Sequence, residues 1–149
     1  MGITSLKENA KATRVMNRGA GAASATPTKG TIIDMQGYES VLFIAALNDV
    51  LDTSAVALRV AGGDVSDTAQ MTLLPGSAGG TAGASDYDNK LLILDVEKPT
   101  QRYLEAQLFH VTANAPFDSV IAIQYGARST PVTQGSTVKA ATTLVSPAA

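Results

Sequence analysis

Few side chains in this sequence have the type and spacing that catalysis needs. Serine hydrolysis requires a Gly-x-Ser-x-Gly turn and a histidine base within reach. The segment Gly76–Gly79 misses that pattern by one residue, and the only histidine, His110, lies between Phe109 and Val111 in a strand-like segment. The sequence has no cysteine, so a thiolate nucleophile and a thiolate metal site are excluded. We therefore expect no enzyme, and we expect His110 to be either structural or surface-exposed.

Cofactor and metal patterns are equally weak. A phosphate-binding loop needs glycines followed by a lysine and a hydroxyl residue at fixed spacing. Thr28–Thr31 lacks the earlier glycine, and the glycine-rich segment 75–85 has no basic residue. Asp86, Asp88 and Asn89 offer oxygen ligands, but the twelve-residue calcium-loop pattern is missing. We expect no cofactor and assign no metal ligand, with calcium at Asp86 and Asp88 left open.

Charge divides the chain into a basic start and an acidic remainder. Residues 1–30 carry five basic side chains against one acidic side chain, Glu8, whereas residues 31–118 have a net charge of -8. Such asymmetry indicates either a segment that binds an acidic protein surface or nucleic acid, or a solvated, frayed terminus. The candidate partner-binding residues are Lys7, Lys11, Arg14, Arg18 and Lys29.

Sequence-specific nucleic-acid binding is not expected. Single-strand recognition uses aromatic side chains interleaved with basic ones. Every aromatic residue lies at position 38 or later, outside the basic segment. Nonspecific contact between the basic segment and phosphates remains open.

The basic segment shows no strand pattern of its own. Residues 5–16 predict a short helix that Gly19 and Gly21 would end, and residues 19–28 predict an extended or flexible linker. We therefore treat residues 1–30 as a basic N-terminal arm, 31–132 as the folded domain and 133–149 as a C-terminal tail.

The folded domain is all-β by its pattern. Short segments rich in β-branched and aromatic residues alternate with turn residues, and no amphipathic helix of crossover length separates them. The predicted strands span 31–35, 39–47, 54–62, 70–74, 90–96, 102–112 and 118–128, with a weak further strand at 142–145. This pattern predicts an antiparallel β-sandwich, most consistent with a jelly-roll-like arrangement.

Two segments of this domain stand out. Val41–Leu47 is apolar on both faces, which predicts a central strand covered on its outer side by another element or by a partner subunit. The loop from Leu74 to Asp88 is long and rich in small residues, so we expect it to be mobile. The longest apolar run is far shorter than a membrane-spanning helix requires, and we expect an intracellular or virion-borne protein without a membrane partner.

Three stretches, Gly30–Ile44, Gln101–Leu104 and Tyr125–Val132, resemble the capsid cement or decoration proteins of tailed double-stranded-DNA bacteriophages, of the Bordetella-phage type. The resemblance spans about residues 30–132 and includes no motif for the first 30 residues. It implies a jelly-roll homodimer on the capsid surface of the virion, made in the host cytoplasm. Such a structural protein would bind the major capsid protein and stabilise junctions between its subunits.

The alternative is another virion component, such as a head-tail connector, a tail protein or a fibre-base protein with a glycan-binding jelly roll. Sugar binding usually needs an exposed aromatic side chain, for which Tyr38 and Tyr87 are the candidates. In the cement interpretation, the strand at Val41–Leu47 would form the dimer contact, and the arm and tail would reach neighbouring capsid subunits.

Overall fold

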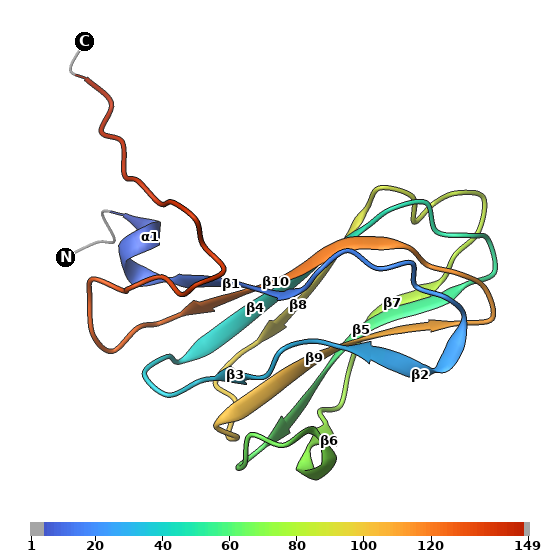
Figure 1. The fold of residues 1–149 in the computed structure, drawn as a ribbon, viewed down its shortest axis with the longest axis horizontal. Helices are drawn as coiled ribbons and strands as arrows, with labels where there is room; N and C mark the ends of the chain where they lie inside the picture. The colour runs from blue at the N-terminus through green and yellow to red at the C-terminus, as the bar shows by residue number, and fades with distance from the viewer. Residues whose placement is uncertain (1–4, 148–149) are drawn as a thin grey trace.

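The computed structural model describes residues 5–147, which form two packed antiparallel sheets (Figure 1). The first sheet has the strand order β1-β10-β4-β8 and the second the order β2-β9-β5-β6, with β3 added on β9 and β7 on β5. The elements are α1 (Leu6–Asn9), β1 (Lys11–Met16), β2 (Ser24–Lys29), β3 (Ile33–Asp34), β4 (Ser40–Leu47), β5 (Ala55–Gly63), the 3-10 helix η1 (Thr68–Gln70), β6 (Thr72–Leu73), β7 (Ala78–Thr81), β8 (Leu91–Val96), β9 (Tyr103–Val111) and β10 (Phe117–Tyr125).

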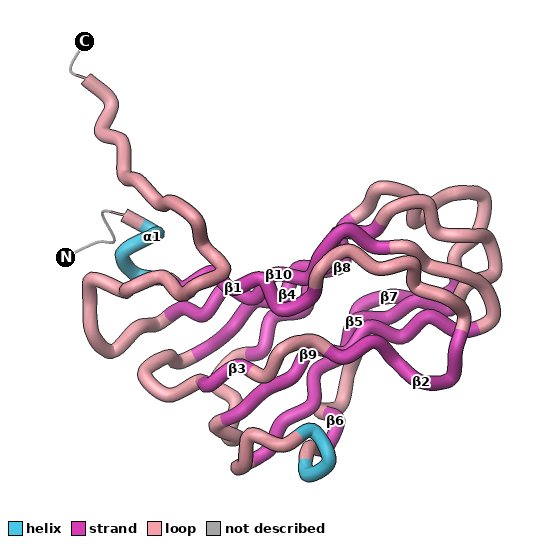
Figure 2. Tube along the Cα trace, in the orientation of Figure 1, coloured by secondary structure: helices cyan, strands magenta, loops and turns pink. Residues whose placement is uncertain are grey.

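This connectivity is that of a jelly roll. We count β2 and β3 together as one strand position, and β6 and β7 together as another, which gives eight positions in chain order. The first sheet then has the order 1-8-3-6 and the second sheet the order 2-7-4-5. The chain thus crosses between the sheets at almost every connection, as two Greek keys require. The predicted antiparallel β-sandwich is confirmed, and Figure 2 shows its two layers of strands with the loops gathered at the ends.

All seven main predicted strands appear, with shorter bounds in most cases. The apolar strand β4 is central, hydrogen-bonded to β10 on one side and to β8 on the other. Its inward side chains Val41, Phe43 and Ala45 are fully buried. Together with Leu58, Leu104 and other side chains from both sheets they form one core, since burial of apolar surface is what holds two sheets together.

The prediction for the first 30 residues is wrong within the part that the structure describes. The helix spans only Leu6–Asn9, and the expected linker contains β2. β1 pairs with β10 and β2 pairs with β9, so residues 11–29 supply an edge strand to each sheet rather than a free arm. Edge strands gain much of their stability from backbone hydrogen bonds to a neighbour, which leave little trace in side-chain periodicity. Residues 1–4 of the predicted arm and 148–149 of the predicted tail lie outside the described residues.

Two further expectations need correction. The predicted weak strand at 142–145 is absent from the described tail, which runs without helix or strand beyond β10. The loop 74–88, expected to be mobile throughout, contains β7, which pairs with Ala55–Leu58 of β5. Glycines allow this pairing because Gly79 adopts φ +143, a conformation that side chains rarely tolerate.

Candidate interaction surfaces

His110 holds strand β2 in place. Its side chain is 4% exposed, with Nδ1 2.8 Å from the Ala22 carbonyl oxygen and Nε2 2.7 Å from Thr28 Oγ1. The carbonyl oxygen can only accept, so Nδ1 donates to it, and Nε2 shares the second hydrogen bond with the Thr28 hydroxyl. Both ring nitrogens are therefore occupied by the fold, so His110 has the structural role and not the surface-exposed position that the sequence also left open.

Of the two calcium candidates, Asp86 is bound into local structure, whereas Asp88 Oδ1 is buried without a hydrogen-bond partner. Asp86 Oδ1 accepts a 2.8 Å hydrogen bond from the Gly83 amide and so closes a loop turn. Residues 5–147 hold no group of three or more His, Asp or Glu side chains placed to bind a metal ion. Tyr38 and Tyr87, the aromatic candidates for a sugar platform, are partly buried and pack against the core. The structure thus gives these two side chains a packing role rather than an exposed platform.

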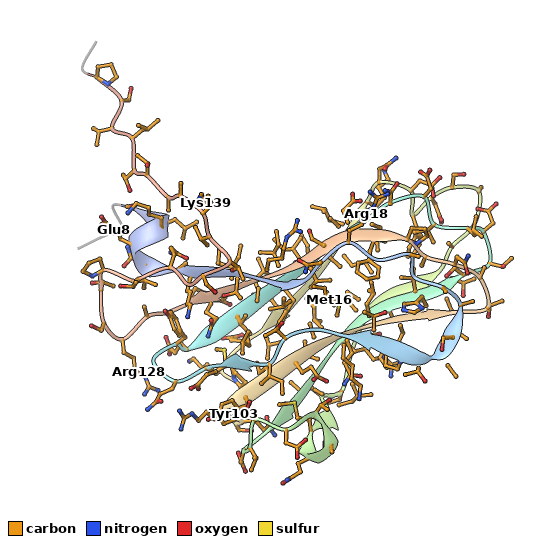
Figure 3. All side chains as sticks on the ribbon, viewed as in Figure 1. Glu8, Met16, Arg18, Tyr103, Arg128 and Lys139 are labelled. Carbon is orange, nitrogen blue, oxygen red and sulfur yellow. The ribbon has the colours of Figure 1, made fainter. Side chains whose placement is uncertain are left out.

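The five basic candidate residues follow the β1 and β2 edges of the sandwich. Lys7 lies on α1, 3.9 Å from the carboxylate of Glu8, and Arg18 follows β1 (Figure 3). Arg14 in β1 and Lys29 at the end of β2 are exposed, and Lys11 is partly exposed. The structure therefore places these five basic side chains on or beside the edge strands β1 and β2, and not on a flexible arm. We call Lys7, Lys11, Arg14, Arg18 and Lys29 the basic rim.

The C-terminal tail covers the free edge of β1. The Gln134 side-chain oxygen accepts from the Ala12 amide at 2.9 Å, and the Thr137 hydroxyl accepts from the Arg14 amide at 3.2 Å. The Gln134 side-chain amide also donates to the carbonyl oxygens of Lys7 and Ala10. Beyond these contacts the tail leads away from the sandwich beside α1 (Figure 1), and its side chains Leu144 and Val145 are almost fully exposed.

The outer face of the β1-β10-β4-β8 sheet is apolar. One cross-strand row runs through all four strands, because Arg14 pairs with Ile121, Ile121 with Ile44, and Ile44 with Ile93. Ile93 is 53% exposed and its neighbour Leu91 is 58% exposed. Ile44 and Ile121 are partly exposed, and the exposed Arg14 stands at one end of the row, a composition that is typical of protein-binding surfaces. We call Arg14, Ile121, Ile44 and Ile93 the isoleucine row.

Sequence reasoning missed Leu91 and Ile93 as candidates. By strand alternation Ile93 shares its face with Asp95 and Glu97, so that face has the pattern of a polar, solvated one. The run of four apolar residues at 91–94 was the available signal, because a strand with one solvated face should alternate.

A groove of about 660 Å³ lies beside the isoleucine row. Leu6 and Asn9 of α1 form one wall, and Leu42, Ile123 and Tyr125 contribute from the sheet. The Tyr125 hydroxyl donates a 2.6 Å hydrogen bond to Asp95, and this bond raises the pKa of Tyr125 above the ordinary tyrosine value. The groove thus extends the apolar face and ends in an acidic group.

Asp34 and Arg102 form an ion pair at the start of the β3–β9 contact. Arg102 donates through Nε to Asp34 Oδ1 and through Nη2 to Asp34 Oδ2, each at 2.9 Å, and its Nη2 also donates to Gln36. The Arg102 hydrogen bonds favour the charged carboxylate and lower the pKa of Asp34 below its ordinary value of 3.8. A depressed pKa stabilises the fold above the unfolded-state pKa, and that contribution is lost as pH falls through the folded-state pKa.

Arg102→Gln is therefore expected to raise the pKa of Asp34 toward 3.8 and to reduce the loss of stability between pH 5 and pH 2. Carboxyl chemical shifts followed by NMR through this range measure the pKa directly. Arg128→Gln, which removes an exposed arginine without a side-chain ion pair, is the matched control. An unchanged Asp34 titration in Arg102→Gln would show that the ion pair does not exist in solution.

Comparisons with known proteins add a similarity to solved structures. No protein-family model matches the chain, and no curated protein matches its sequence. Among solved structures, the chain is similar to the receptor-binding domain of the spike protein P1 from bacteriophage PM2, with 13% sequence identity and a TM-score of 0.44. The similarity covers 76% of this chain and 93% of that domain. In the described part of the chain, no helix has the length and apolar character needed to cross a membrane.

Proposed function

We propose that this protein is a capsid cement, or decoration, protein of a tailed bacteriophage. In this proposal it is a non-enzymatic homodimer that binds the outside of the head, contacts the major capsid protein and stabilises the junctions between capsid subunits. It is made in the host cytoplasm and acts on the virion surface. The observation that carries the proposal is the isoleucine row, an apolar strip across four paired strands that is partly exposed at Ile44 and Ile121, exposed at Ile93, and ends in Arg14.

An apolar sheet face that is exposed to water favours the binding of another protein. Large apolar side chains exposed together on a sheet face gain free energy when another protein covers them. The basic residues beside this face favour an acidic partner surface, and they also orient it. On a lattice, many weak contacts of this kind add up, because each bound copy holds its neighbours at high effective concentration.

The resemblance of residues 30–132 to phage cement proteins supports the same function. Another virion component, such as a connector or a fibre-base protein, remains the alternative. The partly buried positions of Tyr38 and Tyr87 give the glycan-binding form of that alternative no support.

Stoichiometry is the first test. The chain is quantified against the major capsid protein in purified particles by calibrated mass spectrometry. We expect a ratio near one or a simple fraction of it. A ratio of a few per cent would contradict the proposal and favour a connector or a tail protein, and absence from the particles would exclude any virion role.

Binding to assembled heads tests the surface itself. Arg14→Gln with Arg18→Gln is expected to weaken binding by roughly tenfold at low salt, because each exposed charge contributes at most about 1 kcal/mol. Raising the salt concentration should weaken wild-type binding and shrink the difference. Lys98→Gln with Arg128→Gln removes the same charge outside the basic residues and the tail and should bind like wild type. Equal affinity of all three proteins would remove the basic rim from the mechanism, and equal affinity for heads and isolated subunits would contradict a cement role.

A further inference from the structure

The free edge of β8 differs from the other sheet edges among residues 5–147. The tail covers the β1 edge through Gln134 and Thr137. The β2 edge contains Pro27 and Lys29 and pairs irregularly with β9, and β6 and β7 are two and four residues long. Proline, lysine, irregular pairing and short length are the means by which proteins keep sheet edges from pairing with other chains. β8 has six residues, pairs regularly with β4 and contains none of these features.

The outward backbone groups of β8 belong to Leu91, Ile93 and Asp95. The Leu47 amide donates to the Lys90 carbonyl oxygen, so position 90 faces β4. Backbone direction alternates along an antiparallel strand, and positions 91, 93 and 95 therefore face away from β4. Among the described residues, the backbone of these three makes no hydrogen bond on that side. A groove of about 200 Å³ separates the end of this edge from Leu74–Gly76.

We propose that β8 pairs antiparallel with β8 of a second copy across a two-fold axis at Ile93. This pairing joins Ile93 to Ile93 of the other copy, and Leu91 of each copy to Asp95 of the other. All three positions present unpaired N–H and C=O groups, so each pair can exchange two hydrogen bonds. On the inner face, Leu92 of each copy lies opposite Leu94 of the other, which covers two half-buried side chains of the core.

Charge identifies the occupant as a second copy of this strand. Lys90 stands at one end of β8, and Asp95 and Glu97 stand at the other end. The antiparallel two-fold arrangement brings Lys90 of each copy beside the acidic end of its partner, whereas a parallel arrangement would place like charges together. In this two-fold pairing the β8 edge of each copy is occupied by the other copy, so neither β8 edge stays free to pair with a third chain.

This inference rests on the homodimer that the proposed function includes, and it identifies β8 as the strand through which the two copies bind each other. The edge contact differs from a contact through the outer face of β4, which the sequence suggested. It joins the two β1-β10-β4-β8 sheets into one continuous sheet, with the isoleucine rows of both copies on the same face and an Arg14 at each far end. That extended face stays free to bind the capsid.

Ile93→Lys tests the contact in the full chain. It places two lysines face to face on the axis, and we expect it to raise the dimer dissociation constant roughly 100-fold or more. Leu51→Lys is the matched control, since Leu51 is 52% exposed and Ile93 53% exposed, and Leu51 lies outside β8. Sedimentation across a concentration series measures the dissociation constants, and circular dichroism confirms that both variants fold.

Complementary charges and a cross-link give the second measurement. A mixture of Ile93→Lys and Ile93→Glu proteins should form a heterodimer, although each variant alone is monomeric. Ile93→Cys should form a disulfide between chains, because hydrogen-bonded antiparallel pairs lie about 5.5 Å apart and the native chain has no cysteine. Leu51→Cys should remain uncross-linked under the same oxidation.

Three results would overturn the inference: a monomeric wild type at micromolar concentration, a wild-type-like dimer for Ile93→Lys, or equal cross-linking of both cysteine variants. These measurements use the isolated protein. They therefore separate a failure of the β8 contact from a failure of the cement function, which the particle stoichiometry decides.

Discussion

Phe43→Ala is expected to lower the free energy of unfolding by about 3–5 kcal/mol, the usual cost of truncating a buried phenylalanine. The Phe43 side chain is fully buried in the central strand β4, where its neighbours across the ladder are Ala122 and Leu94. Truncation leaves a cavity between the sheets that small neighbours cannot fill. Denaturant unfolding followed by circular dichroism measures the change.

Leu51→Ala is the control for this substitution. Leu51 is apolar but half exposed and lies between β4 and β5, so its truncation should change stability by less than about 0.5 kcal/mol. A similar loss for both variants would mean that β4 is not the centre of the core. A loss of this size for Phe43→Ala alone would support the packing described above.

The central position of β4 in its sheet could be predicted from the sequence. Seven apolar residues in a row predict a central strand, and β4 is hydrogen-bonded to a neighbour on each side. The predicted cover on its outer side is not supplied by residues 5–147, where Leu42 and Ile44 stay partly exposed. The same logic located β5, β9 and β10, whose inward positions alternate with outward ones. Hydrophobic periodicity thus determined the sheet class and most of the core.

The basic segment shows where periodicity fails. β1 and β2 contain few apolar side chains, and only Val15 and Met16 of these strands are buried. Their places are set by backbone hydrogen bonds and by single polar contacts, such as that between Thr28 and His110. Such contacts depend on residues far away in the chain, so no local pattern predicts them. The charge asymmetry was real, but its conversion into a flexible arm ignored that edge strands can be polar.

The candidate site was predicted in part for the same reason. The basic residues were identified by number, yet only the strand register shows that Arg14 continues a row of three isoleucines. Ile121, Ile44 and Ile93 come from three separate strands, and the sequence alone offers no measure of which side chains lie opposite one another. The strand register decides which side chains lie together on the face of a sheet, and the register is known only from the folded chain.

Gly79→Ala is expected to cost roughly 1–3 kcal/mol, the price of a side chain in a disallowed backbone conformation. Gly79 has φ +143, and an added Cβ would lie 2.1 Å from the Val56 carbonyl oxygen. The variant should release β7 from β5, which hydrogen exchange would detect as faster exchange of the amides at Ala78–Thr81.

Gly83→Ala tests whether this effect belongs to β7 and not to the glycine-rich segment in general. An added Cβ at Gly83 would meet no atom within 4 Å, and Gly83 has no positive φ. This variant should therefore leave both stability and exchange within error of wild type. If Gly79→Ala behaved like Gly83→Ala, segment 75–85 would be the mobile loop that its composition suggests. A selective loss at Gly79 would show that glycine is needed there so that the backbones of β7 and β5 can approach closely, which small-residue composition alone does not distinguish from flexibility.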